Sequence, residues 1–326
     1  MATATRSDRA ILGAPSPQVS APPCDAWDGP ACSRTTYGTE RGVSANRSLY
    51  HYTTASGLLG ILTTQTIRAT DVRFLNDARE ALYARDLVLN AISQMDNPVL
   101  RPDHFAHDLG HYAVETFEEY KRYFFETLAS TDFGVYAARF CESGDLLSQW
   151  RGYGAEHGYA IELDAAKLAA VSGSPAMYTP ASHLIEVRYG SEAAADIASE
   201  AVRAVGDFNL NHPGVKSYYK ALEVSALLAT VKDPAFRQEE EWRLLAALEP
   251  EGPAGGPGAP ESLVKYRSTS MAIVPYIELP FAIDAIRSIR LGPGNYGDVR
   301  EAGVRKLLAS LGSSAAVSRS EVPLRA

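Results

Sequence analysis

Two side chains of one predicted strand could together bind a ligand. Residues 49–52 are Leu-Tyr-His-Tyr, residue types that favour strands. His51 and Thr53 are two positions apart, and side chains at that spacing share one face of a strand. An imidazole and a hydroxyl on one face could orient a polar ligand by hydrogen bonds. The alternative is a half-buried strand histidine with a structural hydrogen bond, and the residues alone favour that alternative.

A second pair of charged side chains opens a predicted strand late in the chain. Residues 241–248 are Glu-Trp-Arg-Leu-Leu-Ala-Ala-Leu, and two further glutamates precede them. Alternation along a strand places Glu241 and Arg243 on one face and Trp242 on the other. Carboxylates at the start of an apolar strand are costly unless they are solvated or used. The alternative is a solvated acidic loop with Trp242 in the core.

A third set combines aromatic rings with a cation. Residues 146–154 predict a short helix or turn that ends at glycine, and they include Gln149, Trp150, Arg151 and Tyr153. A Trp and a Tyr on either side of an Arg could stack on a planar ring while the Arg binds phosphate. A Trp that anchors the loop to the core is at least as well supported.

A fourth set precedes a predicted helix that runs to about residue 94. Asp77 and Glu80 have the spacing of a capping box with aspartate as the cap, so capping explains both residues. Capping gives no reason for Arg73 and Asn76 nearby. We therefore count Arg73 and Asn76 among the candidate ligand-binding residues.

Three histidines, His104, His107 and His111, would share one face of a helix. Two of them could hold one zinc ion, but the third lies a further turn away and no nearby cysteine completes a tetrahedral set. A solvated helix face is the favoured interpretation. A metal-dependent hydrolase remains a weaker alternative, and we expect no metal.

The elements that must position these residues indicate an α+β fold. Strands are predicted near residues 49–53, 65–70, 133–141, 159–163, 183–189, 241–248, 272–279 and 286–291. Helices are interspersed irregularly rather than in strict βαβ alternation, which favours a central mixed or antiparallel sheet with helical insertions. The Pro- and Gly-rich residues 250–260 suggest a hairpin tip.

Composition narrows the class of protein. The chain has 326 residues, 46% of them hydrophobic, and a formal net charge of −8, which argues against a general nucleic-acid-binding surface. Three cysteines are too few for a disulfide framework and fit a reducing compartment. The sequence contains no transmembrane run and no signal peptide, so we expect a cytoplasmic protein without membrane partners. The oligomeric state is left open.

Several motifs, taken in order, resemble one protein family. The motifs are Leu49–Thr53, Arg73–Asp77 with Glu80, Leu147–Gly154 with Tyr159–Leu163, Phe236–Arg243, Leu291–Pro293 and Ser320–Arg325. Together they are similar to the bacterial family of unknown function called DUF2971. The resemblance covers about residues 47–325. Residues 1–46 are rich in Ala, Ser, Pro and Gly and show no helical or strand period, so we expect a disordered leader there. We expect one domain over residues 47–326, with a helical insert at about 95–130.

A more distant resemblance suggests an activity. His-x-Thr on a first strand is similar to the opening of ADP-ribosyltransferase folds, which have a split sheet. In those folds the His binds a ribose hydroxyl of NAD, and a Glu on a late strand holds the ribose beside the bond that is cut. The resemblance implies that Glu241 and His51 are catalytic. It also implies a set of residues that bind NAD as a substrate: Tyr52, Thr53, Arg73, Asn76, Gln149, Trp150, Arg151, Tyr153 and Arg243.

The expected function is therefore an NAD-dependent ADP-ribosyltransferase-like enzyme, of the toxin or defence-effector kind, with an unidentified acceptor. A carboxylate near the ribose stabilises the oxocarbenium character of the transition state. The alternative is a non-catalytic ligand-binding or regulatory module on the same fold. The enzyme requires His51 and Glu241 to lie on adjacent or nearly adjacent strands and to face one cleft within roughly 15 Å of each other. Glu241 should be partly exposed, and Trp150 or Tyr153 should line that cleft. Opposite sheet faces, or a Glu241 buried in ion pairs, would count against it.

Overall fold

The computed structural model describes residues 46–75, 78–94, 134–154, 157–171, 182–200, 226–248, 263–269 and 272–323. The chain divides into two units, Met1–Thr36 and Tyr37–Ala326, and all of the described residues lie in the second. The predicted leader, the helical insert, Asn76 and the three histidines of the metal hypothesis lie outside the described residues. Among the described residues, no helix is both long and apolar enough to cross a membrane.

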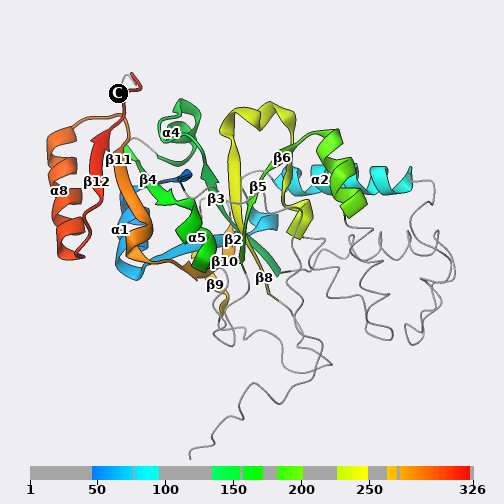
Figure 1. Ribbon diagram of the computed structural model, residues 1–326, viewed down its shortest axis with the longest axis horizontal. Coiled ribbons are helices and arrows are strands. Elements are labelled where there is room, and N and C mark those ends of the chain that lie inside the picture. The colour runs from blue at the N-terminus through cyan, green and yellow to red at the C-terminus, as the bar shows by residue number, and fades with distance from the viewer. Residues whose placement is uncertain are drawn as a thin grey trace, which may run out of the picture. The chain divides into compact units, whose positions relative to one another are not determined.

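Strands and helices alternate irregularly along the chain (Figure 1). The strands are β1 (Ser48–Thr53), β2 (Thr66–Asp71), β3 (Gly134–Cys141), β4 (Tyr159–Asp164), β5 (Ser182–Glu186), β6 (Arg188–Tyr189), β7 (Val231–Lys232), β8 (Glu241–Leu248), β9 (Lys265–Ser268), β10 (Ile273–Pro280), β11 (Ile286–Leu291) and β12 (Ala316–Arg319). The α-helices are α1 (Ala55–Thr64), α2 (Ala78–Ser93), α4 (Leu147–Tyr153), α5 (Ala165–Val171) and α8 (Gly297–Ser310).

One large mixed sheet dominates the described part of the chain. Its strand order is β12-β11-β4-β1-β3-β2-β10-β9, with β8 also paired to β3 and β5 paired to β8. Its pairs are antiparallel except for the parallel pair of β11 and β12. The prediction of a mixed sheet with several helices is therefore confirmed.

Helix α1 shows why the chain folds back on the sheet after β1. Thr54 caps the helix, because its Oγ1 accepts a hydrogen bond from the Gly57 backbone amide at 3.2 Å. Leu58, Ile61 and Leu62 recur at helical spacing and are buried. This apolar stripe packs on one face of the sheet.

That face carries the main hydrophobic core. Every second residue along several strands belongs to one hydrophobic cluster. The cluster also includes side chains from α1, α5 and α8. On β1 the cluster contains Leu49, and on β3 it contains Ala138 and Phe140. On β8 it contains Trp242 and Leu244. We call this the core face of the sheet.

The other face carries two smaller apolar clusters with a polar strip between them. One cluster groups Tyr52, Cys141, Trp150 and Ala160, and α4 contributes its tryptophan. The second groups Val135, Ala137, Ala226, Ala229 and Leu245. Between the two clusters, β3 carries Arg139 and β8 carries Glu241 and Arg243. We call this the second face of the sheet.

Three details differ from the predictions. Residues 183–189 do not form one strand, because β5 pairs with β8 whereas β6 pairs with β7 in a separate two-stranded sheet. Residues 250–260, the predicted hairpin tip, lie outside the described residues, and the described strands on either side of them do not pair with each other, since β8 pairs with β3 and β5 and β9 pairs with β10. Strand β9 was not predicted, because all four of its residues are exposed and it lacks an apolar pattern.

Candidate functional site

The backbone of β3 has two different neighbours along one edge. Strand β1 pairs with it at Cys141, and β2 pairs with it at Tyr136 and Ala137. The carbonyl of Arg139 lies between these two pairings. The Nδ1 atom of His51 is 2.9 Å from this carbonyl oxygen, so an imidazole fills the gap in the strand ladder.

The environment of His51 fixes its protonation. A carbonyl oxygen can only accept, so Nδ1 carries the proton and Nε2 is left as an acceptor. Burial lowers the pKa of His51 and outweighs the opposing effect of the hydrogen bond to the Arg139 carbonyl, so the ring is neutral at pH 7. No described residue hydrogen-bonds to Nε2, and His51 is partly exposed. The ring packs on Phe140, with centroids 5.7 Å apart.

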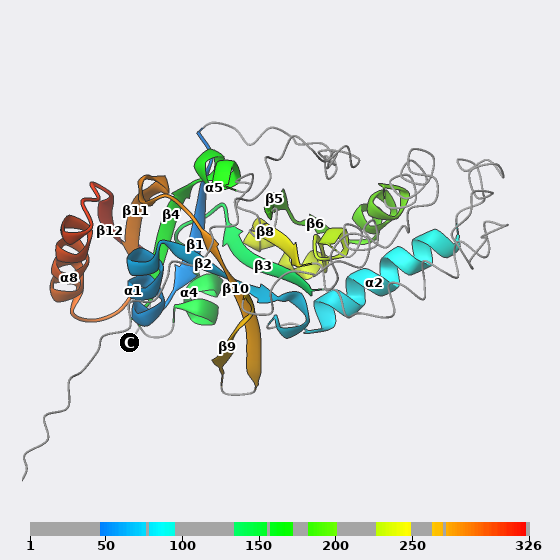
Figure 2. The ribbon, with the colours of Figure 1, turned by 90° about the horizontal axis from the view of Figure 1, so that it is seen from below.

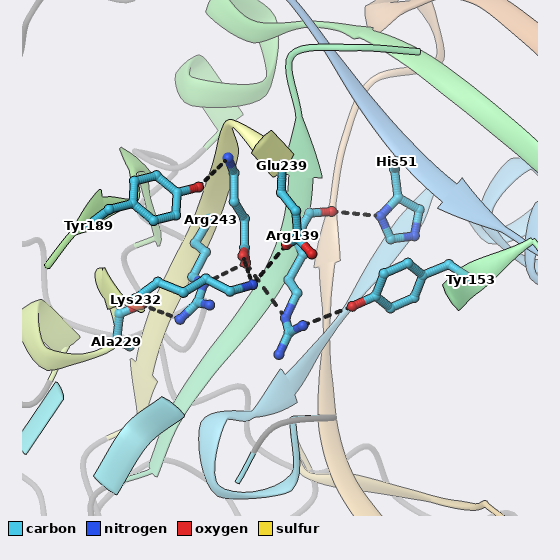
Figure 3. A network of polar contacts seen from close by, with 9 residues as sticks. His51, Arg139, Tyr153, Tyr189, Ala229, Lys232, Glu239 and Arg243 are labelled. Atoms are coloured by element: carbon cyan, nitrogen blue, oxygen red, sulfur yellow. Dashed lines mark hydrogen bonds and ion pairs between the residues drawn. The ribbon is translucent and has the colours of Figure 1, made fainter. Parts of the chain in front are cut away.

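The side chain of Arg139 connects the junction to α4. Its Nη1 donates to the Tyr153 hydroxyl at 2.9 Å, and its Nε lies 3.6 Å from Glu241 Oε1. The Arg139 side chain is 17% exposed and Tyr153 is also partly exposed. Figure 3 shows the Arg139 carbonyl at the imidazole of His51 and the Arg139 guanidinium at the hydroxyl of Tyr153. We call His51, Arg139 and Tyr153 the junction residues.

Glu241 is buried, contrary to the predicted partial exposure, and only 3% of its surface is accessible. Its Oε1 accepts a hydrogen bond from Arg243 Nε at 2.7 Å, and its Oε2 accepts one from Lys232 Nζ at 2.7 Å. Burial alone would raise the pKa of Glu241, but the charges of Arg243, Arg139 and Lys232 outweigh burial and lower it to about 2. Both carboxylate oxygens are thus engaged in ion pairs.

The cluster around Glu241 extends to the small sheet of β6 and β7. Lys232, which is 1% exposed, also pairs with Glu239 at 2.8 Å. Arg243, which is 2% exposed, donates to the Ala229 carbonyl. The Tyr189 hydroxyl accepts a hydrogen bond from the backbone amide of Glu241 at 3.0 Å. These contacts fix the start of β8, and Figure 3 shows the whole network.

The register of the strands separates His51 from Glu241. Tyr50 pairs with Cys141, and Cys141 pairs with Glu241, so these three side chains lie in one row on the second face. His51 is one residue along from Tyr50 and contacts Phe140 of the core face. The two predicted catalytic residues are on strands with only β3 between them, as predicted, but on opposite faces of the sheet.

Trp150 anchors α4 to the sheet, so the alternative interpretation of its motif is correct. It is 2% exposed, its Nε1 donates to Asp145 Oδ1 at 2.8 Å, and its ring meets Tyr52 edge-on at 4.6 Å. A Cβ on Gly292 would lie 2.7 Å from the indole, so a glycine is required there. Trp150 is therefore a core residue and presents no open aromatic wall.

The other predicted ligand-binding residues are distributed between core and surface. Tyr52 is buried, donates to the Ser143 carbonyl at 3.0 Å, and its pKa is raised, mainly by burial. Gln149 is buried, Arg151 is exposed and Thr53 is partly exposed. The Arg73 guanidinium holds Asp71 through both carboxylate oxygens, at 3.0 and 2.7 Å.

Two of the predicted residues, His51 and Tyr153, both bond to Arg139, which the sequence analysis did not select. His51 bonds to the backbone carbonyl of Arg139 and Tyr153 to its guanidinium. The structure places Glu241 with Arg243, as alternation indicated, and adds Lys232, which was also missed. A lysine directly after the largely apolar residues 227–231 was the available signal for Lys232. Arg139 stands in the predicted strand 133–141 between apolar neighbours, and that position was its only signal.

Comparison with known proteins identifies a family over part of the chain. The model of the family described as a protein of unknown function (DUF2971) matches residues 149–244, which confirms the resemblance to this family over those residues. The matched segment begins within α4, contains β4 and ends within β8, so it includes Tyr153 and Glu241 but neither His51 nor Arg139. No curated protein and no solved structure gave a match.

Proposed function

We propose that the protein is a ligand-binding module that holds a nucleotide-like ligand at the junction residues without turning it over. The observation that carries this proposal is the neutral, partly exposed imidazole of His51, whose Nε2 accepts no hydrogen bond from any described residue. Its Nδ1 donates to the carbonyl of Arg139, and the partly exposed side chain of Arg139 donates to the partly exposed Tyr153.

The three junction residues offer complementary contacts to such a ligand. Nε2 of His51 accepts a hydrogen bond from a ribose hydroxyl. The Arg139 guanidinium donates to a phosphate oxygen, and the ring of Tyr153 packs against a planar base. The buried ion pairs of Glu241 hold the start of β8 beside Arg139, and the Arg139 guanidinium bonds to the Tyr153 hydroxyl, so the cation is oriented before the ligand arrives.

The arrangement of Glu241 favours binding over catalysis. A carboxylate that stabilises an oxocarbenium ion must reach the ribose in the transition state. Both oxygens of Glu241 accept hydrogen bonds from buried cations, and only 3% of the residue is accessible. On this proposal Glu241 is a structural residue.

The NAD-dependent ADP-ribosyltransferase is the second candidate, with NAD as the substrate and an unidentified acceptor. A specific observation favours it: the sheet opens at β3 beside a strand His-x-Thr, and the late glutamate starts a strand only two positions away in the sheet. The low pKa of Glu241 also keeps it ionised, as an electrostatic role requires. In this candidate the separation of β1 from β2 along β3 corresponds to the split sheet of the transferase fold, and the protein acts as a toxin or defence effector.

Calorimetry with NAD and with ADP-ribose tests the binding proposal. The informative variant is His51→Asn, whose amide can still donate to the Arg139 carbonyl from the position of Nδ1 but has no atom at Nε2. We expect binding to wild type and roughly tenfold or greater weakening in the variant. Tyr153→Phe should also weaken binding, whereas Tyr296→Phe, a 77% exposed tyrosine, should leave it unchanged. No binding of either nucleotide to wild type would reject the proposal.

Incubation with NAD labelled in the ADP-ribose moiety separates the two candidates. Label transfer to a protein or nucleic acid, or release of nicotinamide, that is lost in folded Glu241→Gln would establish the transferase. Binding without transfer or hydrolysis would support the binding module. Because Glu241→Gln is expected to lose stability, its folded fraction must be measured under the conditions of the assay.

A further inference from the structure

Three basic side chains gather on the second face of the sheet, along β2, β10 and β9. Thr70 of β2 pairs with Tyr276 of β10, and Tyr276 pairs with Lys265 of β9, so these residues form one row across the strands. Arg68 and Arg267 are each two positions from this row and share its face. Figure 2 shows β9 and β10 as neighbouring strands that extend from the rest of the sheet.

The two guanidinium groups converge on the middle of this row. Cζ of Arg68 lies 4.9 Å from the centroid of the Tyr276 ring, which is a cation–π contact. Nη2 of Arg267 donates to Oγ1 of Thr70 at 3.2 Å. Arg68 of β2 thus lies over the Tyr276 ring, and Arg267 of β9 reaches across β10 to Thr70, which pairs with Tyr276.

One carboxylate, that of Glu278, accompanies these three cations, and Glu278 stands opposite Arg68 in the pairing of β2 with β10. The nearby carboxylate of Glu278 pairs with Lys265 at 2.6 Å. Neither Arg68 nor Arg267 has a carboxylate within ion-pair distance among the described residues. Burial, and to a smaller extent the positive charge of Arg68, lower the pKa of Arg267, as expected for two cations that face the same row.

We propose that Arg68 and Arg267, with the hydroxyl of Thr70, form a binding site for a phosphate group or a similar oxyanion. Two arginines that approach without a carboxylate lower their repulsion when an oxyanion lies between them, and each can donate two parallel hydrogen bonds. Lys265 adds a further cation at the edge. The site uses none of the junction residues, so it does not depend on the function proposed above.

Titration of inorganic phosphate tests the site. The ionic strength is kept constant with sodium chloride, so that screening does not change, and binding is followed by calorimetry and by the melting temperature. We expect a phosphate-dependent rise of the melting temperature in wild type, because a ligand that binds the folded state stabilises it. Arg68→Gln and Arg267→Gln should each raise the dissociation constant roughly tenfold or more, and the double variant should not bind.

Arg305→Gln is the matched control, because Arg305 is an exposed arginine of α8 that pairs with Glu301 and lies near β12, at the opposite end of the sheet (Figure 1). It should keep the wild-type dissociation constant. Without phosphate, Arg68→Gln should melt at or above the wild-type temperature, since it removes a repulsion, whereas a merely structural arginine would lower the melting temperature. No phosphate effect in wild type, or equal weakening by Arg305→Gln, would overturn the proposal.

Discussion

Replacing Glu241 with glutamine tests whether the buried ion cluster determines the stability of the start of β8. Glutamine has nearly the same shape as glutamate, so the substitution removes a charge without opening a cavity. It leaves Lys232 and Arg243 buried at 1% and 2% exposure without the carboxylate that both of them contact.

The size of the effect follows from the pKa. Folding lowers the pKa of Glu241 from its usual 4.5 to about 2. At about 1.4 kcal/mol per unit, this difference corresponds to about 3 kcal/mol in the free energy of unfolding. Removing one partner of a buried ion pair costs a similar ~3–5 kcal/mol in other proteins. We therefore expect Glu241→Gln to lose about 3 kcal/mol at pH 7.

Urea denaturation of wild type and variant over a range of pH is the assay. A carboxylate whose pKa is lowered by folding stabilises the protein above its unfolded pKa, and this contribution is lost as the pH falls through the folded pKa. The difference between wild type and Glu241→Gln should therefore be full above about pH 5 and should shrink steadily towards pH 2.

Asp298→Asn is the control, because Asp298 is 94% exposed at the side chain and pairs with Arg319 on the surface. Exposed ion pairs contribute little to stability, so this variant should unfold like wild type. A loss below about 1 kcal/mol in Glu241→Gln at pH 7, against the ~3 expected, would refute the cluster as a stabilising unit. A loss that stays constant between pH 5 and pH 2 would refute the role of its ionised form.

Three further predictions follow from burial and geometry. Nucleotide binding at His51 should be constant above pH 7. It should weaken as the pH falls through the lowered pKa of His51, because protonated Nε2 can no longer accept a hydrogen bond. Calorimetry at several pH values would show this, and a rise in affinity at low pH would contradict it. Gly158→Ala should be destabilising, since its Cβ would lie 2.2 Å from Gly154 Cα. Gly60→Ala in α1 would place its Cβ where no atom lies within 4 Å, so it should gain about 0.5–1 kcal/mol of stability. Melting temperatures equal to that of wild type would contradict both predictions. Trp150→Ala should lose about 3–5 kcal/mol in urea unfolding, and a loss below about 1 kcal/mol would show that the indole is not a core residue.

Local patterns were enough to predict most of the elements around the site. The alternation of 159–163 and the apolar runs at 133–141 and 241–248 predict β4, β3 and β8, since strands buried on one or both faces carry these patterns. Strand β7 has only two residues, and β9 is exposed throughout, so neither leaves an apolar signature. The end of β5 at Glu186 likewise depends on pairing with β8 and has no local signal.

The candidate site was harder to predict because it depends on register. Alternation correctly placed Glu241 and Arg243 on one face of β8. The pairing of Cys141 with both Tyr50 and Glu241 decides whether His51 lies on that face too. A shift of one residue in this register would move His51 to the same face as Glu241. Burial of the carboxylate likewise depends on Lys232, which enters from a separate strand.

The motifs that the sequence analysis singled out divide into two groups once their contacts are known. The glycines at 154, 158 and 292 let α4, β4 and the turn after β11 approach one another, and Trp150 fills the space between them. Packing therefore explains these residues fully. His51 differs, because its structural bond to the Arg139 carbonyl uses Nδ1 alone and a smaller amide could supply that bond. Apart from the packing of the ring on Phe140, only a partner at Nε2 would call for a histidine here, and this is the physical reason to look for a ligand at the junction residues.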